Sequence, residues 1–137
     1  MKVTPYLFFN GTCEEAVKFY EKVLGAKVAF MMRYKDMPAE ATHSAEDDPK
    51  IAHVRFTIGD SVVMASDAPP QRFNKPQGFD MSLGIDKPEE ADRIFAALSE
   101  GGTVTMPIAE TFWAHRFGAL VDKFGTPWMV NCEKPMA

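Results

Sequence analysis

Cysteine, excess charge of either sign and long hydrophobic runs are all scarce in this sequence, and each shortage excludes a class of protein. Only two cysteines occur among 137 residues, and Cys13 and Cys132 match neither a metal-binding spacing nor a secreted disulfide framework. Fifteen basic and nineteen acidic residues leave a formal net charge of −4, which does not support a nucleic-acid surface. No apolar run approaches the roughly 20 residues of a membrane helix, and the first residues lack a signal-peptide pattern. We therefore expect a soluble cytoplasmic protein that binds neither nucleic acid nor membrane.

The residue types that are present are typical of one globular domain. Hydrophobic types make up 46% and charged types 25% of the chain, which are ordinary proportions for a folded soluble protein. A chain of 137 residues lies within the usual size range of a domain and is long enough to bury a substantial core. Composition alone indicates no function.

The start of the chain predicts a strand, a helix and a second strand. Residues 2–9 are rich in β-branched and aromatic types and end at a turn-forming Asn-Gly pair, which favours a strand. Thr12 and Glu15 have the spacing of a capping box at the start of a helix. Apolar residues follow at helical spacing as far as Gly25, and residues 27–34 again favour a strand.

The same order of elements returns about 75 positions later. Residues 80–85 favour a strand, and residues 86–89 form a second capping-box pattern. The Glu-Glu-Ala triplet that opens the first helix recurs at the start of the second. A Gly-Gly pair ends this helix, and residues 103–106 are again extended in type. The repetition predicts an internally duplicated domain.

Each copy is also expected to end in a hairpin. Residues 51–58 and 61–66 are strand-like runs around Gly59-Asp60, a favoured two-residue turn. In the second copy the corresponding runs are residues 117–121 and 126–131. Each unit is therefore predicted to contain a strand, a helix and three further strands.

The boundaries follow from these elements. We expect the first unit to span residues 1–67 and the second to span residues 79–137. The proline-rich stretch 68–78 is expected to link them, and the polar, acidic stretch 38–50 is expected to form an exposed loop.

Three motifs give the chain a resemblance to a known family. They are FFNGTCEEAVKFYEKVLGAKV near the start, HVRFTIGDSVVMASD in the middle and ETFWAHRFGALVDKFGTPWMVN near the end. The sequence resembles the PhnB-like branch of the vicinal-oxygen-chelate superfamily, which includes glyoxalase I, bleomycin-resistance proteins and extradiol dioxygenases. The resemblance implies an α+β fold of two βαβββ units related by pseudo-two-fold symmetry, whose curved mixed sheets form a cup. Such sequences are often labelled demethylubiquinone methyltransferases, but no strand–Gly-rich loop–helix unit suited to S-adenosylmethionine is present.

The resemblance also implies where a divalent metal would bind. Enzymes of this superfamily place four ligands on the first and last strands of the two units, and the motifs carry these positions over to Pro5, Met64, Asp80 and Met129. Proline has no side-chain ligand atom, and a thioether is a soft, weak ligand for metals that prefer nitrogen or oxygen. We therefore expect no metal and no other cofactor. A shift of the alignment would instead bring in His53, His115 or Glu110.

Strand alternation predicts which side chains face the cup. If Gly59-Asp60 is a two-residue turn, Arg55 lies opposite Met64 and His53 lies opposite Ser66. His53 and Arg55 then share the face that carries Met64. The other face is expected to pack under a helix and to carry Val54, Phe56, Val63 and Ala65. A count across the second hairpin pairs Arg116 with Asn131, beside Met129.

Each candidate also has a structural interpretation. His53 can make a structural hydrogen bond, and Arg55 can be a solvated or ion-paired strand residue. Trp113 can pack in the core or on a strand edge as well as form a ligand wall. The methionines can fill the core, although a methionine floor also suits an adaptable pocket. Cys13 lies in a first helical turn without a partner base in view, and we interpret it as structural.

The leading functional hypothesis is a metal-free protein that binds a small molecule. Two guanidinium groups against one carboxylate leave the predicted cup positive, which favours a small organic anion. The predicted ligand-binding residues are His53, Arg55, Met64, Asp80, Trp113, Arg116 and Met129. The alternatives are a lyase, isomerase or dioxygenase with an unrecognised metal or a His53 or Asp80 base, and an interaction module with an unused cup. No catalytic residue is assigned. Free sheet edges predict a homodimer.

Overall fold

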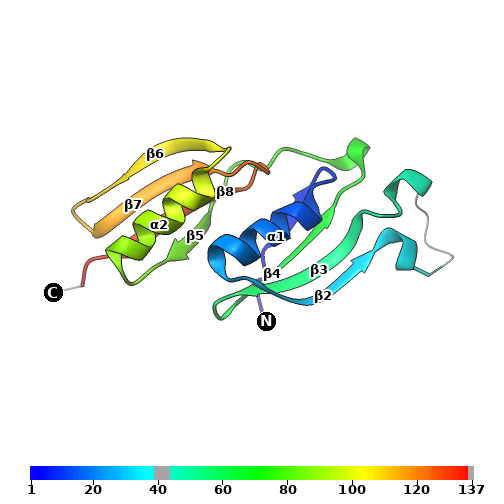
Figure 1. The fold of residues 1–137 in the computed structure, drawn as a ribbon, viewed down its shortest axis with the longest axis horizontal. Helices are drawn as coiled ribbons and strands as arrows, with labels where there is room; N and C mark the ends of the chain where they lie inside the picture. The colour runs from blue at the N-terminus through cyan, green and yellow to red at the C-terminus, as the bar shows by residue number, and fades with distance from the viewer. Residues whose placement is uncertain (39–43, 136–137) are drawn as a thin grey trace. The chain divides into compact units, whose positions relative to one another are not determined.

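The computed structural model describes residues 1–38 and 44–135 of the chain. The chain divides into two compact units, Met1–Asn74 and Lys75–Ala137. In each unit the described residues form a four-stranded mixed sheet with one α-helix packed on it (Figure 1). The boundary between the units falls inside the stretch that we expected to link the two copies. Part of the expected 38–50 loop, residues 39–43, lies outside the described residues.

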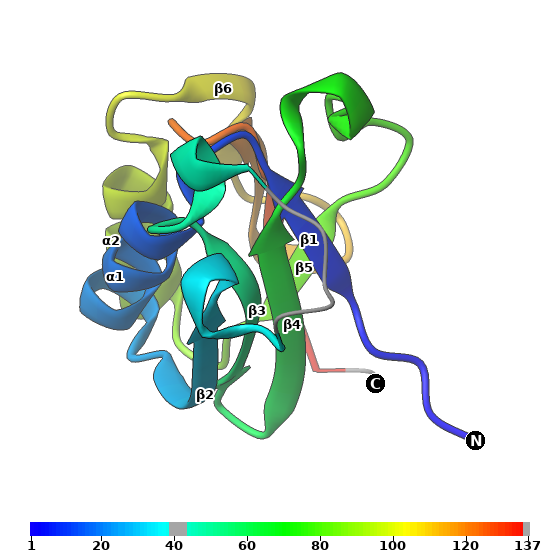
Figure 2. The same ribbon diagram turned by 90° about the vertical axis from the view of Figure 1, so that its right-hand side faces the viewer.

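The first unit has the predicted order of elements. Its strands and helix are β1 (Tyr6–Phe9), α1 (Cys13–Leu24), β2 (Lys27–Arg33), β3 (Ile51–Ile58) and β4 (Ser61–Asp67). The sheet order is β1-β4-β3-β2, with β1 parallel to β4 and the other pairs antiparallel. Figure 2 shows β1, β4 and β3 side by side. Short 3₁₀ turns occur at Tyr34–Asp36, Ala45–Asp47 and Pro70–Arg72.

The second unit repeats this topology. Its elements are β5 (Met81–Gly84), α2 (Pro88–Ser99), β6 (Thr103–Ala109), β7 (Ala114–Val121) and β8 (Pro127–Glu133). The sheet order is β5-β8-β7-β6, again with the first strand parallel to the last. The predicted α+β fold of two βαβββ units is therefore confirmed. None of the described helices is both long enough and apolar enough to span a membrane.

One face of the first sheet packs against α1. Val54, Phe56, Val63 and Ala65 are all buried, as the alternation predicted. The ring of Tyr20 from α1 stacks on Phe56 with centroids 6.3 Å apart, which places these side chains beneath the helix. Burial of such side chains stabilises each by about 1.5–3 kcal/mol relative to exposure. The residues that alternate with these along β3 and β4 lie on the opposite face of the sheet.

In the second unit, packing of the core requires a close approach between α2 and β7. Phe95 of α2 and Leu120 of β7 are buried together with Trp128 and Val130 of β8. A Cβ atom at Gly118 would lie only 2.7 Å from the Phe95 ring and 2.9 Å from the Cα of Ile108. Glycine at this position therefore lets the helix approach the sheet.

The two predicted capping boxes are wrong. Thr12 occupies the N-cap position of α1 but makes no side-chain capping bond. The free amide of Cys13 instead donates to the Asp67 carboxylate at 2.9 Å, so a distant residue replaces the local cap. The second helix begins at Pro88 with Lys87 at its N-cap, and no side-chain capping bond forms there either.

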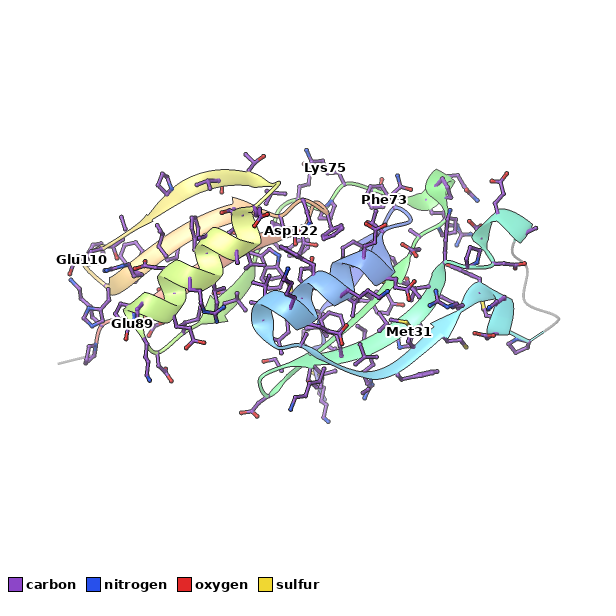
Figure 3. All side chains as sticks on the ribbon, in the orientation of Figure 1. Met31, Phe73, Lys75, Glu89, Glu110 and Asp122 are labelled. Carbon is purple, nitrogen blue, oxygen red and sulfur yellow. The ribbon has the colours of Figure 1, made fainter. Side chains whose placement is uncertain are left out.

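A buried aspartate also organises the loop between β7 and β8. Figure 3 labels Asp122 in this loop. One carboxylate oxygen accepts the amides of Phe124 and Thr126 at 2.9 and 3.0 Å, and the other accepts Nε1–H of Trp128 at 2.9 Å. Val121 pairs with Pro127, so the loop between β7 and β8 has five residues. The three hydrogen bonds to Asp122 hold this loop together.

Candidate functional site

The face of the first sheet away from α1 carries most of the predicted site. Arg55 pairs with Met64, which confirms the count across the first hairpin. Met64 also pairs with Tyr6 of β1, and Arg55 pairs with Phe30 of β2. His53 shares this face with Arg55 by strand alternation. We call it the open face of the first unit.

Four rings form a row across this open face, which we call the aromatic row. The Tyr6 hydroxyl lies 3.1 Å from Nδ1 of His53. The Tyr6 ring centroid lies 4.9 Å from that of Phe8 and 5.7 Å from that of His53, and the Phe30 centroid lies 6.2 Å from His53. The three carbocyclic rings remain substantially exposed, at 36% for Tyr6, 52% for Phe8 and 45% for Phe30. The row therefore offers an apolar surface around one imidazole.

Arg55 stands beside this row with an incompletely satisfied guanidinium. Its Nη2 lies 3.9 Å from the Met64 sulfur, and a thioether is only a weak acceptor. Among the described residues no carboxylate forms an ion pair with Arg55. Its side chain is exposed. The open face therefore presents a guanidinium that can bind an oxyanion through two parallel hydrogen bonds.

Tyr6 was missed by reasoning from the sequence, which assigned the first-strand position to Pro5. In the structure Pro5 precedes β1, and its carbonyl accepts the Met64 amide at 3.0 Å. Tyr6 is the residue of β1 that pairs with Met64. The sequence does not show this pairing, because β1 and β4 are parallel and distant in sequence and no turn fixes their register.

Arg116 does not lie where the count across the second hairpin predicted. It pairs with Cys132, whereas Phe117 pairs with Asn131. The Arg116 Nε donates to Asp92 of α2 at 3.0 Å, so this guanidinium lies on the helix side of the sheet. The predicted pairing is wrong by one residue because the count assumed a four-residue loop, whereas Asp122 holds a five-residue loop.

The remaining candidates lie in the second unit. Trp113 contacts Phe112 and Phe117, with ring centroids 4.8 and 5.3 Å apart. Met129 pairs with Ala119 of β7 and with Ser82 of β5. Asp80 is exposed and immediately precedes β5, which begins one residue later than expected. These residues belong to the second unit, and the open face belongs to the first.

The side chains at the expected metal-ligand positions do not fit a divalent metal ion. The motifs assign these positions to Pro5, Met64, Asp80 and Met129. Proline has no side-chain ligand atom, the two thioethers are weak ligands, and a single carboxylate at Asp80 does not provide a ligand set for a divalent metal. In the part of the chain that the structure describes, no group of three or more His, Cys, Asp and Glu residues could hold a metal.

An alignment shift does not supply a ligand set either. The Glu110 carboxylate, labelled in Figure 3, forms an ion pair with Lys134 at 2.9 Å. The hydrogen bond and charge of Lys134 lower the pKa of Glu110. Nδ1 of His53 lies within hydrogen-bond distance of the Tyr6 hydroxyl.

The cysteine at the start of α1 is not an activated nucleophile. Cys13 is buried and free. Burial raises the pKa of its thiol, and the negative charges of Asp67 and Glu14 raise it further. A thiol held protonated is a poor nucleophile, which favours the structural interpretation.

The fold of the chain is that of glyoxalase-like proteins. It superposes on a glyoxylase/bleomycin resistance protein/dioxygenase domain from Frankia sp. EAN1pec with a TM-score of 0.67 at 12% identity, covering 98% of each chain. This likeness defines the vicinal-oxygen-chelate fold. Residues 1–131 match the model of the family described as 3-demethylubiquinone-9 3-methyltransferase, and the chain belongs to this PhnB-like family.

Relatives match nearly the whole chain. Protein YjdN from Escherichia coli strain K12 is 39% identical over 142 residues, covering 98% of this chain and 97% of that protein. The crystal structure of PA1353 from Pseudomonas aeruginosa is 42% identical with a TM-score of 0.90, covering 98% and 99% of the two chains. A putative 3-demethylubiquinone-9 3-methyltransferase, PhnB protein, from Bacillus cereus is 25% identical with a TM-score of 0.81, covering 96% and 99%.

The residues after β1 do not fit the S-adenosylmethionine that the family description implies. The turn between β1 and α1 contains a single glycine, Gly11, and the first helical amide, at Cys13, is already bonded to Asp67. A nucleotide-binding turn instead brings several glycines and free amides to the ligand. The family membership therefore shows the fold of the chain and its relatives, but not its activity.

Proposed function

We propose that this PhnB-like protein binds a small organic anion on the open face of its first unit. The observation that carries the proposal is the exposed guanidinium of Arg55, which has a thioether as its near neighbour and no ion-pair partner among the described residues. A carboxylate or phosphonate would supply the missing acceptors through charge-assisted hydrogen bonds. The proposed site comprises His53, Arg55 and Met64, to which we add Tyr6.

The aromatic row supports an anion that also carries a planar or apolar group. Phe8 and Phe30 expose ring surface on either side of the Tyr6–His53 pair. Covering such surface contributes about 25 cal/mol per Å² of apolar area removed from water. The guanidinium would bind the charged end of the ligand, and the rings would contact the remainder. From the second unit we propose Trp113, Met129 and Asp80 as further ligand-binding residues.

Calorimetric titration with benzoate, benzylamine and benzamide tests the proposal, since the three probes share a ring and differ in charge. We expect saturable binding of benzoate and weaker or no binding of the cationic and neutral probes. Arg55→Ala should weaken benzoate binding by about 1.5–3 kcal/mol, the range for hydrogen bonds to charged groups. The matched control is Arg93→Ala on α2, which removes an exposed guanidinium paired with Glu90. Equal binding of all three probes, or equal effects of both variants, would refute the anion site.

The Tyr6–His53 contact favours one further candidate function. This function requires the hydrogen bond to run from Nδ1–H of His53 to the Tyr6 oxygen, which leaves Nε2 as a free acceptor that can remove a proton from a substrate. The protein would then be a metal-independent lyase or isomerase. Exchange of the α-protons of 2-oxo acids with D2O, followed by NMR, tests this activity. Exchange that disappears in His53→Gln supports a catalytic base, whereas exchange that is unchanged in this variant excludes it.

A further inference from the structure

We propose that Tyr6 is a positioning residue that makes His53 a second anion donor beside Arg55. In this arrangement the Tyr6 hydroxyl donates to Nδ1 of His53, so the neutral imidazole carries its proton on Nε2. Nε2–H then adds to the donors of Arg55 on the open face. The inference rests on the proposed anion-binding function and names the second group that recognises the ligand.

The structure brings Tyr6 to His53 across an intervening strand. Tyr6 belongs to β1 and His53 to β3, and β4 lies between them in the sheet. Ser66 of β4 pairs with Phe8 and is buried, although strand alternation puts it on the face of Met64. A small side chain at this position lets the Tyr6 phenol reach over β4 to the imidazole. The 3.1 Å contact is therefore a product of the register and of a small residue between the two rings.

Neighbouring rings limit the movement of this pair. The Phe8 centroid lies 4.9 Å from that of Tyr6, and the Phe30 centroid lies 6.2 Å from that of His53. The Tyr6 and His53 ring planes are inclined by 33°. Because side chains that pack against one another lose rotamer freedom on folding rather than on binding, the imidazole is oriented before a ligand arrives.

The direction of the hydrogen bond follows from the chemistry of the two groups. A phenol is the more acidic group and the better donor, and the lone pair of an imidazole nitrogen is a good acceptor. This direction places the proton of the neutral imidazole on Nε2.

The two donors suit one oxyanion. His53 and Arg55 are two residues apart on one strand face, which separates their Cα atoms by about 6.6 Å. Side chains rising from such positions can converge on a single carboxylate or phosphonate. Neither Nε2–H nor a guanidinium can accept a hydrogen bond, so neither group can pair with an ammonium group. The recognised class is therefore an oxyanion attached to a planar apolar group.

NMR of ¹⁵N-labelled histidine at neutral pH tests the positioning step without a ligand. We expect long-range ¹H–¹⁵N correlations of His53 to show Nε2 protonated and Nδ1 unprotonated. In Tyr6→Phe both nitrogens should shift toward the values of a mixed tautomer population. The matched control is Tyr34→Phe, which removes the hydroxyl that donates to the Asp67 carbonyl at 2.7 Å and should leave His53 unchanged. A wild-type protein with protonated Nδ1, or a Tyr6→Phe spectrum identical to the wild type, would overturn the inference.

Binding of benzoate tests whether the positioned imidazole contributes to recognition. Tyr6→Phe should weaken the affinity about fivefold, the loss expected when one modest hydrogen bond is impaired, and His53→Gln should weaken it at least as much. If Tyr6→Phe changes the tautomer but leaves benzoate affinity unchanged, the recognition role is wrong and the anion site remains. If the wild type binds no benzoate, the recognition role fails together with the proposed function, whereas the tautomer measurement still decides the role of Tyr6 toward His53.

Discussion

The carboxylate of Asp67, at the end of β4, accepts the backbone amide of Cys13 at the start of α1 at 2.9 Å. Its other oxygen accepts the amide of Ile51, the first residue of β3, also at 2.9 Å. The carboxylate is buried. One side chain therefore satisfies a helix N-terminus and a strand start that are far apart in the sequence.

Replacing this carboxylate should destabilise the first unit. Asp67→Asn keeps the shape but removes the charge and one acceptor, so one buried amide loses its partner. We expect a loss of about 1.5–3 kcal/mol in the free energy of unfolding, measured by urea denaturation. Asp60→Asn, in the exposed turn between β3 and β4, is the control and should change stability little. Equal stability of both variants would show that Asp67 does not hold the helix start.

The close approach of α2 to β7 gives a second prediction. Gly118→Ala places a Cβ 2.7 Å from the Phe95 ring and 2.9 Å from the backbone of Ile108. The helix or the neighbouring strand must move, and overpacking of this kind lowers stability by about 1–3 kcal/mol. Gly84→Ala is the control, since nothing lies within 4 Å of its Cβ. A thermal melt in which both variants match the wild type contradicts the predicted packing.

Only one of the two hairpin registers could be predicted from the sequence, for a physical reason. The two residues between β3 and β4 form a turn whose length is fixed, so the pairing of Arg55 with Met64 followed by counting. The loop between β7 and β8 is set by the three hydrogen bonds that Asp122 accepts. Because those bonds depend on the folded loop, its length was misjudged and Arg116 was placed on the wrong face.

The helix positions and the repeat of elements were predictable because hydrophobic spacing is local information. The role of Tyr6 was not, because it depends on a parallel pairing between β1 and β4 that no turn defines. The predicted capping boxes were also wrong. At the first helix the amide of Cys13 donates to Asp67, which is far away in the sequence. The periodicity of the elements was thus predictable, whereas the side-chain hydrogen bonds that fix the helix starts and the β7–β8 loop were not.

The side chains at the expected ligand positions predict that the protein carries no stoichiometric transition metal. Pro5 has no side-chain ligand atom, Met64 and Met129 supply soft thioethers that are poor ligands for zinc, manganese or nickel, and Asp80 supplies a single carboxylate. Elemental analysis of protein purified without chelator should find well below one metal per chain. Recovery of about one metal per chain, lost in Met64→Ala, would show that these positions bind metal after all.

The exposed edges of the sheets predict a homodimer. The strands β2 and β6 each end their own sheet, and both expose apolar side chains, among them Val28, Val104 and Met106. Exposed apolar edges are usually covered by another element or another copy. Sedimentation equilibrium at micromolar concentration should give twice the chain mass of 15.3 kDa. A single species of the chain mass would contradict this prediction.

The ion pair between Arg33 and Glu14 predicts a pH-dependent contribution to stability. Arg33 donates to both carboxylate oxygens of Glu14, linking the end of β2 to the first turn of α1. These hydrogen bonds, and then the charge of Arg33, lower the pKa of Glu14 below its ordinary value of 4.5. A lowered carboxyl pKa stabilises the folded state above the unfolded pKa, and this contribution is lost as the pH falls through the folded pKa.

Glu14→Gln should therefore be less stable than the wild type in urea denaturation at pH 7, and the difference should shrink as the pH is lowered from 5 toward 2. Glu15→Gln, one residue along and exposed, should show no such convergence; a Glu14→Gln difference that is constant over this range would mean that the ion pair does not stabilise the fold.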